Sequence, residues 1–459
     1  MVSAQKSSAV SSSLPRKCKI TVASPLLPAT LPDWLELLEK RHPKTIDLGL
    51  ERCNEVWLRM GSPLPAEKIF VVAGTNGKGS TVSTLCALLD SLGKRYGSYT
   101  SPHIETYNER VRVAGLAVSD DTLIEAFLRI EAARDGRSLS YFEFSTLAAI
   151  DILHRAELEF AVMEVGLGGR LDAVNILDAD CAVITPIGLD HQAYLGNDRY
   201  SIGREKAGII RAGRPVICGD PEPPASIAET AAAKGAAVRQ LGRDFSITER
   251  AGRARYRSNG LELDVPLPVL AGHHQLGNMA TALAALLELV PSAADSIDAL
   301  ECGLRSVSLH GRFERIMQKP TVWLDVGHNP LAAEAVARAL REAMVAEGIQ
   351  RCRCVLGMLA DKDAAAVVGP LQPLIAHWYC AGLGSGRGQS GEQLARQVKE
   401  TLNGQQLEVY DRVGNALEAA LRASASNDAV LVFGSFLTVT DAIRHLRTDT
   451  ARIPPEGQG

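Results

Sequence analysis

The sequence lacks both the positive charge of a nucleic-acid-binding protein and the long apolar segments of a membrane protein. Its 49 lysines and arginines are outnumbered by 53 aspartates and glutamates, and the net charge is −4. A nucleic-acid surface needs a basic excess, and a membrane helix needs roughly 20 consecutive apolar residues. No run in the sequence approaches that length. We therefore expect neither a nucleic acid nor a membrane as a partner, whereas a small anionic ligand remains compatible with a locally positive site.

Patterns typical of disulfide frameworks and metal-binding cysteines are also missing. The nine cysteines are scattered and form no C-x-x-C pair. An odd number without regular spacing favours reduced thiols in a reducing compartment, so we expect a cytoplasmic protein. Cys352 and Cys354 are close in sequence. Because no second Cys/His pair lies nearby to complete a metal site, we interpret them as two residues on one face of a strand.

The first 32 residues contain no acidic side chain and many serines. This composition resembles a transit peptide, but we interpret residues 1–28 as a disordered extension. They contain no apolar core like that of a secretory signal. The 459-residue chain as a whole has 46% hydrophobic and 22% charged residues, which is ordinary globular usage. Its length favours two or three domains.

Apolar strands alternate with amphipathic helices from residue 68 onward. Continuous apolar runs such as FAVME and CAVIT are typical of strands buried on both faces of a parallel sheet. We predict strands at residues 68–74, 96–102, 159–166, 180–187 and 214–220. We predict helices at residues 81–93, 120–136, 144–157, 224–235, 275–290 and 293–307. Ser119 is the expected N-cap of the second helix, and Asn259-Gly260 the expected turn of an antiparallel hairpin within residues 244–268.

A second alternating block begins near residue 321. We predict its strands at residues 321–327, 351–359, 377–383, 407–411 and 429–435, with helices at 329–345 and 391–404. Two blocks of strand-helix alternation predict two doubly wound α/β domains. We place the boundary in the segment LHGRFERI. The resulting division is an extension at 1–28, a first domain at 29–308, a linker at 309–316 and a second domain at 317–459.

A glycine-rich turn, GTNGKGS at residues 74–80, joins the first predicted strand to the first helix. Glycines let backbone N–H groups point at phosphate oxygens, and the helix N-terminus favours the same anion. Lys78 can reach the terminal phosphates, and Ser80 or Thr81 can ligate Mg²⁺. The spacing departs from the standard P-loop pattern. A plain strand-helix turn, however, does not need a lysine between two glycines, so we interpret the segment as a phosphate cradle.

Three polar residues follow other predicted strands of the first sheet. Ser101, Glu164 and His191 lie at carboxyl ends of strands, where open α/β sheets bind ligands. Together they could hold Mg²⁺, although the ion prefers oxygen ligands and a histidine such as His191, taken alone, is more often a capping or hydrogen-bonding residue. Lys206, in REKAGII, is either a solvated surface group or a functional lysine.

Eight ordered motifs connect the chain to a known family. The motifs are GTNGKGS, TSPH, SYFE, EVGLGGRLDAVN, GLDH, REKAG, GRFE and LDVGHNP. This set resembles the folylpolyglutamate synthase and dihydrofolate synthase branch of the Mur ligases over about residues 45–440. The resemblance implies an N-terminal P-loop ATPase-type domain joined to a smaller C-terminal Rossmann-like glutamate-ligase domain. It also implies an ATP-dependent ligase that adds L-glutamate to dihydropteroate and folates, acting as a monomer.

The resemblance assigns roles to individual positions. Ser101, Glu164 and His191 should bind two Mg²⁺ ions, and Lys206 matches a lysine that is N6-carboxylated in the family. Lys78 and His328 should act in catalysis, with His328 and Asn329 facing the cleft. Residues implied to hold ATP are Thr75, Asn76, Gly77, Lys78, Gly79, Ser80, Asn278, Arg312 and Asp325. Residues implied on the pterin side are Asp47, Leu48, Gly49, Leu50, Ser140, Tyr141, Phe142, Glu143, Leu171, Asp172 and Ala173.

The implied chemistry is phosphorylation of a carboxylate by ATP, followed by attack of the glutamate amine on the acyl phosphate. Two rivals differ in what they require. A cell-wall Mur ligase needs an extra N-terminal nucleotide-sugar domain, for which the 73 residues before Gly74 are too few. A regulatory nucleotide-binding module does not need Glu164, His191 and Lys206. Within the folate interpretation, the segment DLGLER favours both activities over folylpolyglutamate synthesis alone.

Overall fold

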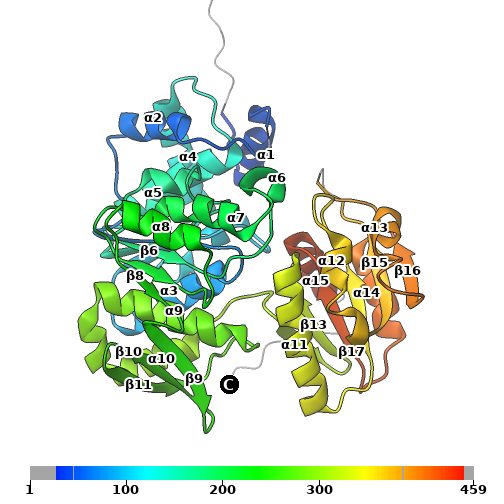
Figure 1. Ribbon diagram of the computed structural model, residues 1–459. Coiled ribbons are helices and arrows are strands. Elements are labelled where there is room, and N and C mark those ends of the chain that lie inside the picture. The colour runs from blue at the N-terminus through cyan, green and yellow to red at the C-terminus, as the bar shows by residue number, and fades with distance from the viewer. Residues whose placement is uncertain (1–26, 45, 385–386, 449–459) are drawn as a thin grey trace, which may run out of the picture.

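Two separate sheets organise the chain, as the computed structural model shows for residues 27–44, 46–384 and 387–448. Figure 1 shows the two α/β domains beside each other, the first coloured blue to green and the second yellow to red. The expected fold class is thus confirmed. Most of the predicted N-terminal extension, residues 1–26, lies outside the described part of the chain. None of the described helices is long and apolar enough to cross a bilayer.

The first domain is built on an eight-stranded sheet with the order β4-β3-β2-β5-β1-β6-β7-β8. β1 lies between β5 and β6 and is parallel to both, with Val72 level with Glu164 and Val183. The carboxyl ends of the central strands therefore meet at one edge. The strands are β1 Lys68–Ala73, β2 Tyr96–Tyr99, β3 Val111–Val113, β4 Leu116–Ala117, β5 Phe160–Glu164, β6 Cys181–Ile184, β7 Val216–Cys218 and β8 Val238–Gln240.

Helices cover both faces of this sheet. Side chains of β1 alternate between two cores: Ile69 and Val71 face one cluster, and Phe70 and Val72 face the other. Burial on both faces explains the continuous apolar runs. The helices are α1 Leu31–Arg41, α2 Glu51–Arg59, α3 Lys78–Ser91, α4 Asp120–Arg134, α5 Tyr141–Arg155, α6 Gln192–Leu195, α7 Arg199–Lys206, α8 Ala225–Ala233, α9 His274–Leu289 and α10 Ile297–Ser306. Ser119 caps α4 as predicted, its side chain accepting from Thr122 N.

A small antiparallel sheet packs beside α9 and α10. Its strands are β9 Phe245–Arg250, β10 Arg253–Ser258 and β11 Leu261–Pro266. Asn259 and Gly260 form the predicted hairpin turn with φ of 47° and 81°, the left-handed conformation that such a turn requires.

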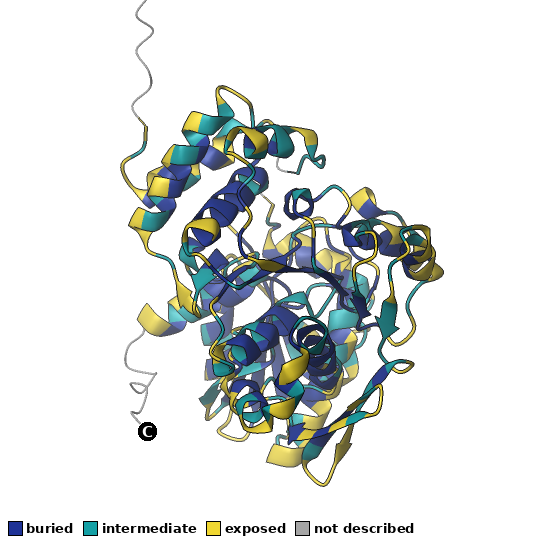
Figure 2. Cartoon of the chain, turned by 90° about the vertical axis from the view of Figure 1, so that its left-hand side faces the viewer, coloured by how far each residue is buried: buried dark blue, intermediate teal, exposed yellow. Residues whose placement is uncertain are grey.

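The second domain is a six-stranded sheet with the order β12-β13-β17-β14-β15-β16. Its strands are β12 Glu314–Gln318, β13 Thr321–Asp325, β14 Cys352–Leu356, β15 Ile375–Ala381, β16 Gln406–Tyr410 and β17 Ala429–Phe433, and its helices are α11 Pro330–Glu347, α12 Ala364–Val368, α13 Gly391–Val398, α14 Val413–Arg422 and α15 Phe436–Thr448. Cys352 and Cys354 are both buried on β14, in agreement with the strand interpretation. Figure 2 shows buried residues concentrated on the strands and the inner faces of helices.

Several elements differ from the sequence prediction. α1 and α2 were not predicted, although α1 buries Leu31, Trp34 and Leu38 along one face. The predicted helix at 391–404 stops at Val398, and residues 293–295 belong to a short 3-10 helix before α10. β3, β4, β8 and β12 were also missed. Each has only two to five residues, too short for a clear alternating pattern.

Candidate active site

The glycine-rich turn lies between β1 and α3, and its conformation requires glycine at two positions. Gly74 has φ of 152°, and a Cβ there would lie 1.8 Å from Thr185 Oγ1. Gly77 has φ of 88°, and a Cβ there would lie 2.3 Å from Asn278 Oδ1. The loop therefore runs in close contact with β6 and α9. Its backbone continues directly into the N-terminus of α3, where unpaired N–H groups favour an anion.

Lys78 lies folded across this loop. Its Nζ donates to the carbonyl oxygens of Gly74 and Thr75, each at 3.2 Å. Thr75 is anchored to the next strand end, since its Oγ1 donates to Gly188 O at 3.1 Å. The ammonium group is thus already near the position where a bound phosphate would attract it.

One cavity of about 320 Å³ opens between the two domains at the carboxyl ends of β1, β2, β5 and β6. Fourteen of the residues that we predicted for catalysis, nucleotide binding or metal binding line it, whereas Thr81, the alternative hydroxyl ligand to Ser80, is buried and does not. The fourteen are Thr75, Asn76, Gly77, Lys78, Gly79, Ser80, Ser101, Glu164, His191, Lys206, Asn278, Arg312, Asp325 and His328. The residues predicted for the pterin side do not line this cavity.

Glu164, the last residue of β5, is buried at the wall of the cavity. Its carboxylate accepts from Ser101 N at 3.1 Å. Burial raises the pKa of Glu164, although the charge of Lys78 opposes the shift. A buried carboxylate with a single backbone donor has free lone pairs for a cation, which suits Mg²⁺.

His191 follows β6 with a left-handed φ of 50°. It occupies the N-cap position of α6 but makes no capping hydrogen bond, so the capping interpretation is wrong. Burial lowers the pKa of His191 to about 4, which leaves the imidazole neutral and able to ligate a metal. Among the described residues, however, no three His, Cys, Asp or Glu side chains are grouped closely enough for a metal site. A metal here would depend on ligands such as Ser101 and phosphate oxygens.

Lys206, the last residue of α7, is a buried group rather than a surface lysine. Its Nζ donates to Gly74 O at 2.8 Å, which places the amine directly under the glycine-rich loop. Burial, reinforced by the charge of Lys78, lowers the pKa of Lys206 to about 7. A substantial fraction of the side chain is therefore neutral amine near neutral pH.

The second domain contributes the opposite wall. The Arg312 guanidinium lies 5.4 Å from the ring centre of Phe436, and Gly79 faces it across the cleft. Asp325 ends β13 and accepts from the backbone N–H groups of Phe313 and Gly327 at 2.8 and 2.7 Å. Burial raises the pKa of Asp325, with the charge of Arg312 opposing.

A polar network that we did not predict joins the two domains beside His191. Asp190 accepts from Lys362 Nζ at 2.5 Å and from Asn329 Nδ2 at 3.1 Å. The side-chain amides of Asn76 and Asn329 face each other at 2.9–3.0 Å. Asp190 stands next to a residue that we did single out, and Lys362 follows a predicted strand. A polar residue just after a predicted strand was therefore the sequence pattern that could have identified Asp190 and Lys362.

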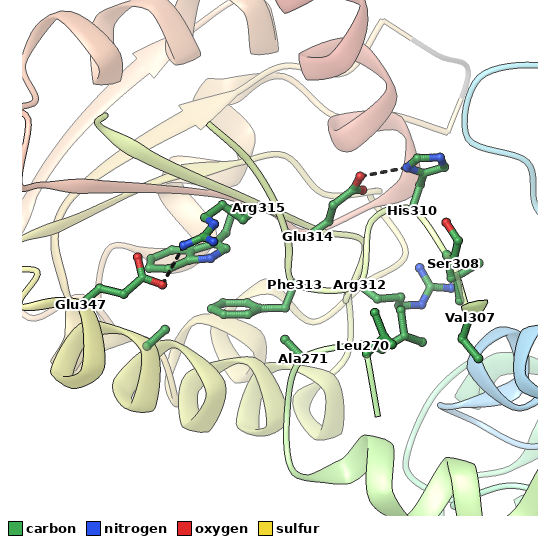
Figure 3. A pocket seen from close by; sticks show the side chains of 14 residues that line it. Leu270, Ala271, Val307, Ser308, His310, Arg312, Phe313, Glu314, Arg315 and Glu347 are labelled. Atoms are coloured by element: carbon green, nitrogen blue, oxygen red, sulfur yellow. Dashed lines mark hydrogen bonds and ion pairs between the residues drawn. The ribbon is translucent and has the colours of Figure 1, made fainter. Parts of the chain in front are cut away.

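A second cavity, of about 440 Å³, lies at the domain junction and includes Arg312 in its wall. Figure 3 shows its sides, where Glu314 pairs with His310 and Glu347 pairs with Arg315, at 2.9 and 3.1 Å. Because Arg312 lines both cavities, they meet at this residue. The linker segment therefore borders open space on one side, while its Phe313 packs into the core of the second domain.

The three segments predicted for the pterin side come together elsewhere in the first domain. Gly49 N donates to Leu171 O at 3.2 Å, and Arg52 pairs with both Asp47 and Glu143, at 2.9 and 3.0 Å. Ser140 and Glu143 form a capping box at the start of α5, so these two side chains stabilise the N-terminus of that helix.

Aromatic rings connect this region to the cavity. The ring of Phe142 lies 6.1 Å from that of Tyr99, and it abuts Gly166, where a Cβ would come within 2.5 Å. Asp172 is buried and accepts from the backbone N–H groups of Leu167 and Val174. Burial raises its pKa to about 6. The pterin-side segments are thus adjacent to the loop that follows Glu164.

Comparison with known proteins gives a consistent assignment. Residues 72–286 match the Mur ligase middle domain, and residues 311–436 match the Mur ligase glutamate ligase domain. The chain is 44% identical over 418 residues to the dihydrofolate synthase/folylpolyglutamate synthase of Escherichia coli (strain K12), covering 91% of this chain and 95% of that protein.

Solved structures agree with the sequence matches. E. coli FolC in complex with DHPP and ADP has a TM-score of 0.84 and 41% identity, covering 92% of this chain and 99% of that one. A bifunctional folylpolyglutamate synthase/dihydrofolate synthase with Mn, AMPPNP and L-glutamate bound has a TM-score of 0.82 and 42% identity, covering 91% and 98%. The chain therefore belongs to the dihydrofolate synthase/folylpolyglutamate synthase family of Mur-type, ATP-dependent ligases.

Proposed function

We propose that this protein joins L-glutamate to dihydropteroate and to tetrahydrofolate polyglutamates, with ATP as the energy source and an acyl phosphate as intermediate. One observation carries the proposal. Fourteen residues predicted to hold nucleotide, metal or reacting groups line a single cavity between the two domains. The relatives with nucleotide, DHPP or L-glutamate bound support the same substrates.

In this proposal the first domain holds the triphosphate. Backbone N–H groups of the glycine-rich loop and the N-terminus of α3 bind the β- and γ-phosphates, and Lys78 neutralises their charge. Asn278, Arg312 and Asp325 contact the rest of the nucleotide from α9 and the second domain. Fixing the γ-phosphate in line with the substrate carboxylate is the main catalytic task, because phosphoryl transfer depends on positioning and charge stabilisation.

The metal-binding residues would be Ser101, Glu164 and His191, with phosphate oxygens completing the shell of two Mg²⁺ ions. Their oxygen and neutral imidazole donors fit an ion held mostly by phosphate and water. When bound, Mg²⁺ neutralises the charge that builds up on the transferring phosphoryl group. The buried Glu164 carboxylate and the neutral His191 side chain are the contribution of this chain.

Lys206 is proposed to be N6-carboxylated. Its buried amine, held against Gly74 O, is partly neutral, and only a neutral amine can attack CO₂. The product is a carbamate, which would replace a buried cation with an anion facing the metal site. The positive charge of Lys78, which acts on Lys206, would then face a negative carbamate.

The acyl substrate is proposed to lie on the pterin-side segments, with its carboxylate directed toward Glu164 and the glycine-rich loop. Glutamate would enter from the second domain near His328. Attack of its neutral amine on the acyl phosphate forms the amide bond and expels phosphate. Closure of the domains would exclude water, which would otherwise hydrolyse the acyl phosphate.

The folylpolyglutamate-only alternative is separated from the bifunctional proposal by a product assay. Purified protein is incubated with ATP, Mg²⁺, L-glutamate and either dihydropteroate or tetrahydrofolate, and products are identified by mass. We expect both acids to gain one glutamate. Product from tetrahydrofolate alone would support the alternative, and phosphate release independent of both the acid and glutamate would contradict the ligase proposal.

We further propose that the protein acts as a monomer in the cytoplasm. Both walls of the cavity come from one chain, so the site needs no second copy. The eight described cysteines are all free thiols, as in a reducing compartment. Sedimentation of the purified protein tests the first statement, and fractionation of cells tests the second.

A further inference from the structure

Arg110 is a buried arginine that the mechanism above does not use. It ends the 3-10 helix Tyr107–Arg110, just before β3, and is only 8% exposed. Its carbonyl accepts from Thr100 N at 2.9 Å, directly before Ser101. The residue is therefore fixed against the strand end that carries a proposed metal ligand.

The Arg110 guanidinium has no anionic partner among the described residues. Its neighbour Glu109 directs its carboxylate away, to the backbone N–H groups of residues 104–106. The side-chain acceptor of Arg110 is His103 Nδ1, at 3.0 Å from Nε. A histidine acceptor carries no negative charge, so it does not neutralise the guanidinium. A buried cation without a counter-charge is costly unless a ligand supplies one.

Aromatic rings surround this cation on the side of the pterin segments. Its Cζ lies 5.2 Å from the ring centre of Tyr107 and 5.4 Å from that of Tyr141. Tyr141 belongs to the predicted pterin-side segment at 140–143. Arg110 is thus located between the acyl-substrate region and the strand end that carries Ser101, which lines the same cavity as Glu164.

We propose that Arg110 binds a carboxylate of the acyl substrate and positions that substrate for phosphorylation. Nε donates to His103 and the Tyr99 hydroxyl also contacts the guanidinium, but the two terminal nitrogens carry enough N–H groups for a forked contact with two carboxylate oxygens, the geometry that arginine favours. The contact is either with the reacting carboxylate, which dihydropteroate and folates share, or with the α-carboxylate beside the reacting one, which only folates carry. This inference rests on the proposed function.

Replacement of Arg110 by methionine tests the idea through steady-state kinetics with each acid. A charged hydrogen bond lost on substitution corresponds to a rise in KM for the acid of about 10- to 100-fold, with KM for ATP unchanged. The matched control is Arg112→Met, because Arg112 lies two residues further along, on β3, and its side chain donates to Gly115 O. A rise with both acids assigns the reacting carboxylate, and a rise with tetrahydrofolate alone assigns the α-carboxylate. No rise with either acid overturns the proposal.

A second variant covers the case in which the methionine variant does not fold. Arg110→Lys keeps the charge and the contact with the aromatic rings but removes the planar fork. We expect its KM to rise about tenfold for the acid whose carboxylate Arg110 contacts, with KM for ATP unchanged. Unchanged KM for both dihydropteroate and tetrahydrofolate overturns the proposal. If the wild-type protein forms no glutamate adduct at all, the proposed function has failed, independently of Arg110.

Discussion

Lys362 of the second domain and Asp190 of the first form a buried ion pair, with 2.5 Å between Nζ and Oδ1. Burial alone would raise the pKa of Asp190, but His328, His191 and Lys362 hold it below its usual range. The carboxylate is therefore charged, and the pair fastens the domains together beside the proposed metal site. Removing the charge of one member of the pair would leave the other buried and unpaired. The pair should therefore favour the closed arrangement of the domains only while both charges are present.

We predict that Lys362→Met weakens domain closure more than it weakens either domain. The kcat/KM for ligation should fall roughly 10- to 100-fold, and X-ray scattering with bound nucleotide should report a more extended protein. Lys40→Met is the control, because Lys40 and its partner Glu36 lie in the same helix and both side chains are exposed. Wild-type scattering and kinetics in the Lys362 variant would contradict the role of this pair in closure.

The pair also marks a limit of sequence interpretation. Lys78 was predictable because strand, glycine turn and helix are consecutive, and Glu164 because strand ends collect at one edge of a sheet. Lys362 and Asp190 are 172 positions apart, and no local pattern relates them. Their contact depends on how the two domains pack, which residue periodicity does not determine.

Other differences between the sequence prediction and the structure lie at elements whose sequence signals were present but covered few residues. Helix α1 has a capping Thr30 and a proline in its first turn, both ordinary start signals. Its 11 residues follow a serine-rich segment that dominated the composition there. Arg312 and Asp325 were predicted only from the family resemblance. Arg312 precedes the strand pair β12 and β13 and Asp325 ends it, and neither position carries a distinctive local sequence pattern.

The second prediction concerns Lys78. Substitution by methionine removes the side-chain charge nearest the expected γ-phosphate, so ligation should fall by about 100-fold or more, while the melting temperature stays close to that of the wild type. Lys94→Met, a variant of a half-exposed lysine just beyond α3, is the control and should retain activity. Near-normal turnover with methionine at position 78 would remove Lys78 from the catalytic machinery.

The third prediction separates backbone conformation from crowding in the glycine-rich turn. Gly77 and Gly93 both have left-handed φ, 88° and 66°, so alanine at either costs about 1 kcal/mol. Only at Gly77 would the added Cβ collide with Asn278. Gly77→Ala should therefore lower the melting temperature further than Gly93→Ala and abolish ATP binding in calorimetry. Equal behaviour of the two variants would mean that the loop moves freely away from α9.

The fourth prediction is a pH dependence that follows from Lys206. Burial lowers the pKa of its amine to about 7, so the neutral form increases as the pH rises through that value. Carbamate formation uses the neutral amine and releases a proton. Reactivation of CO₂-depleted enzyme by bicarbonate should therefore be more complete at about pH 8 than at about pH 6. The modified lysine itself is detected by ¹³C NMR after labelling with ¹³CO₂.

Two variants make this prediction specific. Lys206→Ala should lose ligation and regain part of it with added acetate or propionate, because a free carboxylate can occupy the place of the carbamate. Lys234→Met is the matched control, since burial also lowers the pKa of Lys234 but its Nζ donates to Ile210 O, away from the cleft. A ¹³C carbamate signal that persists in the Lys206 variant, or ligation that ignores bicarbonate at every pH, would assign the buried amine a purely structural role beneath Gly74.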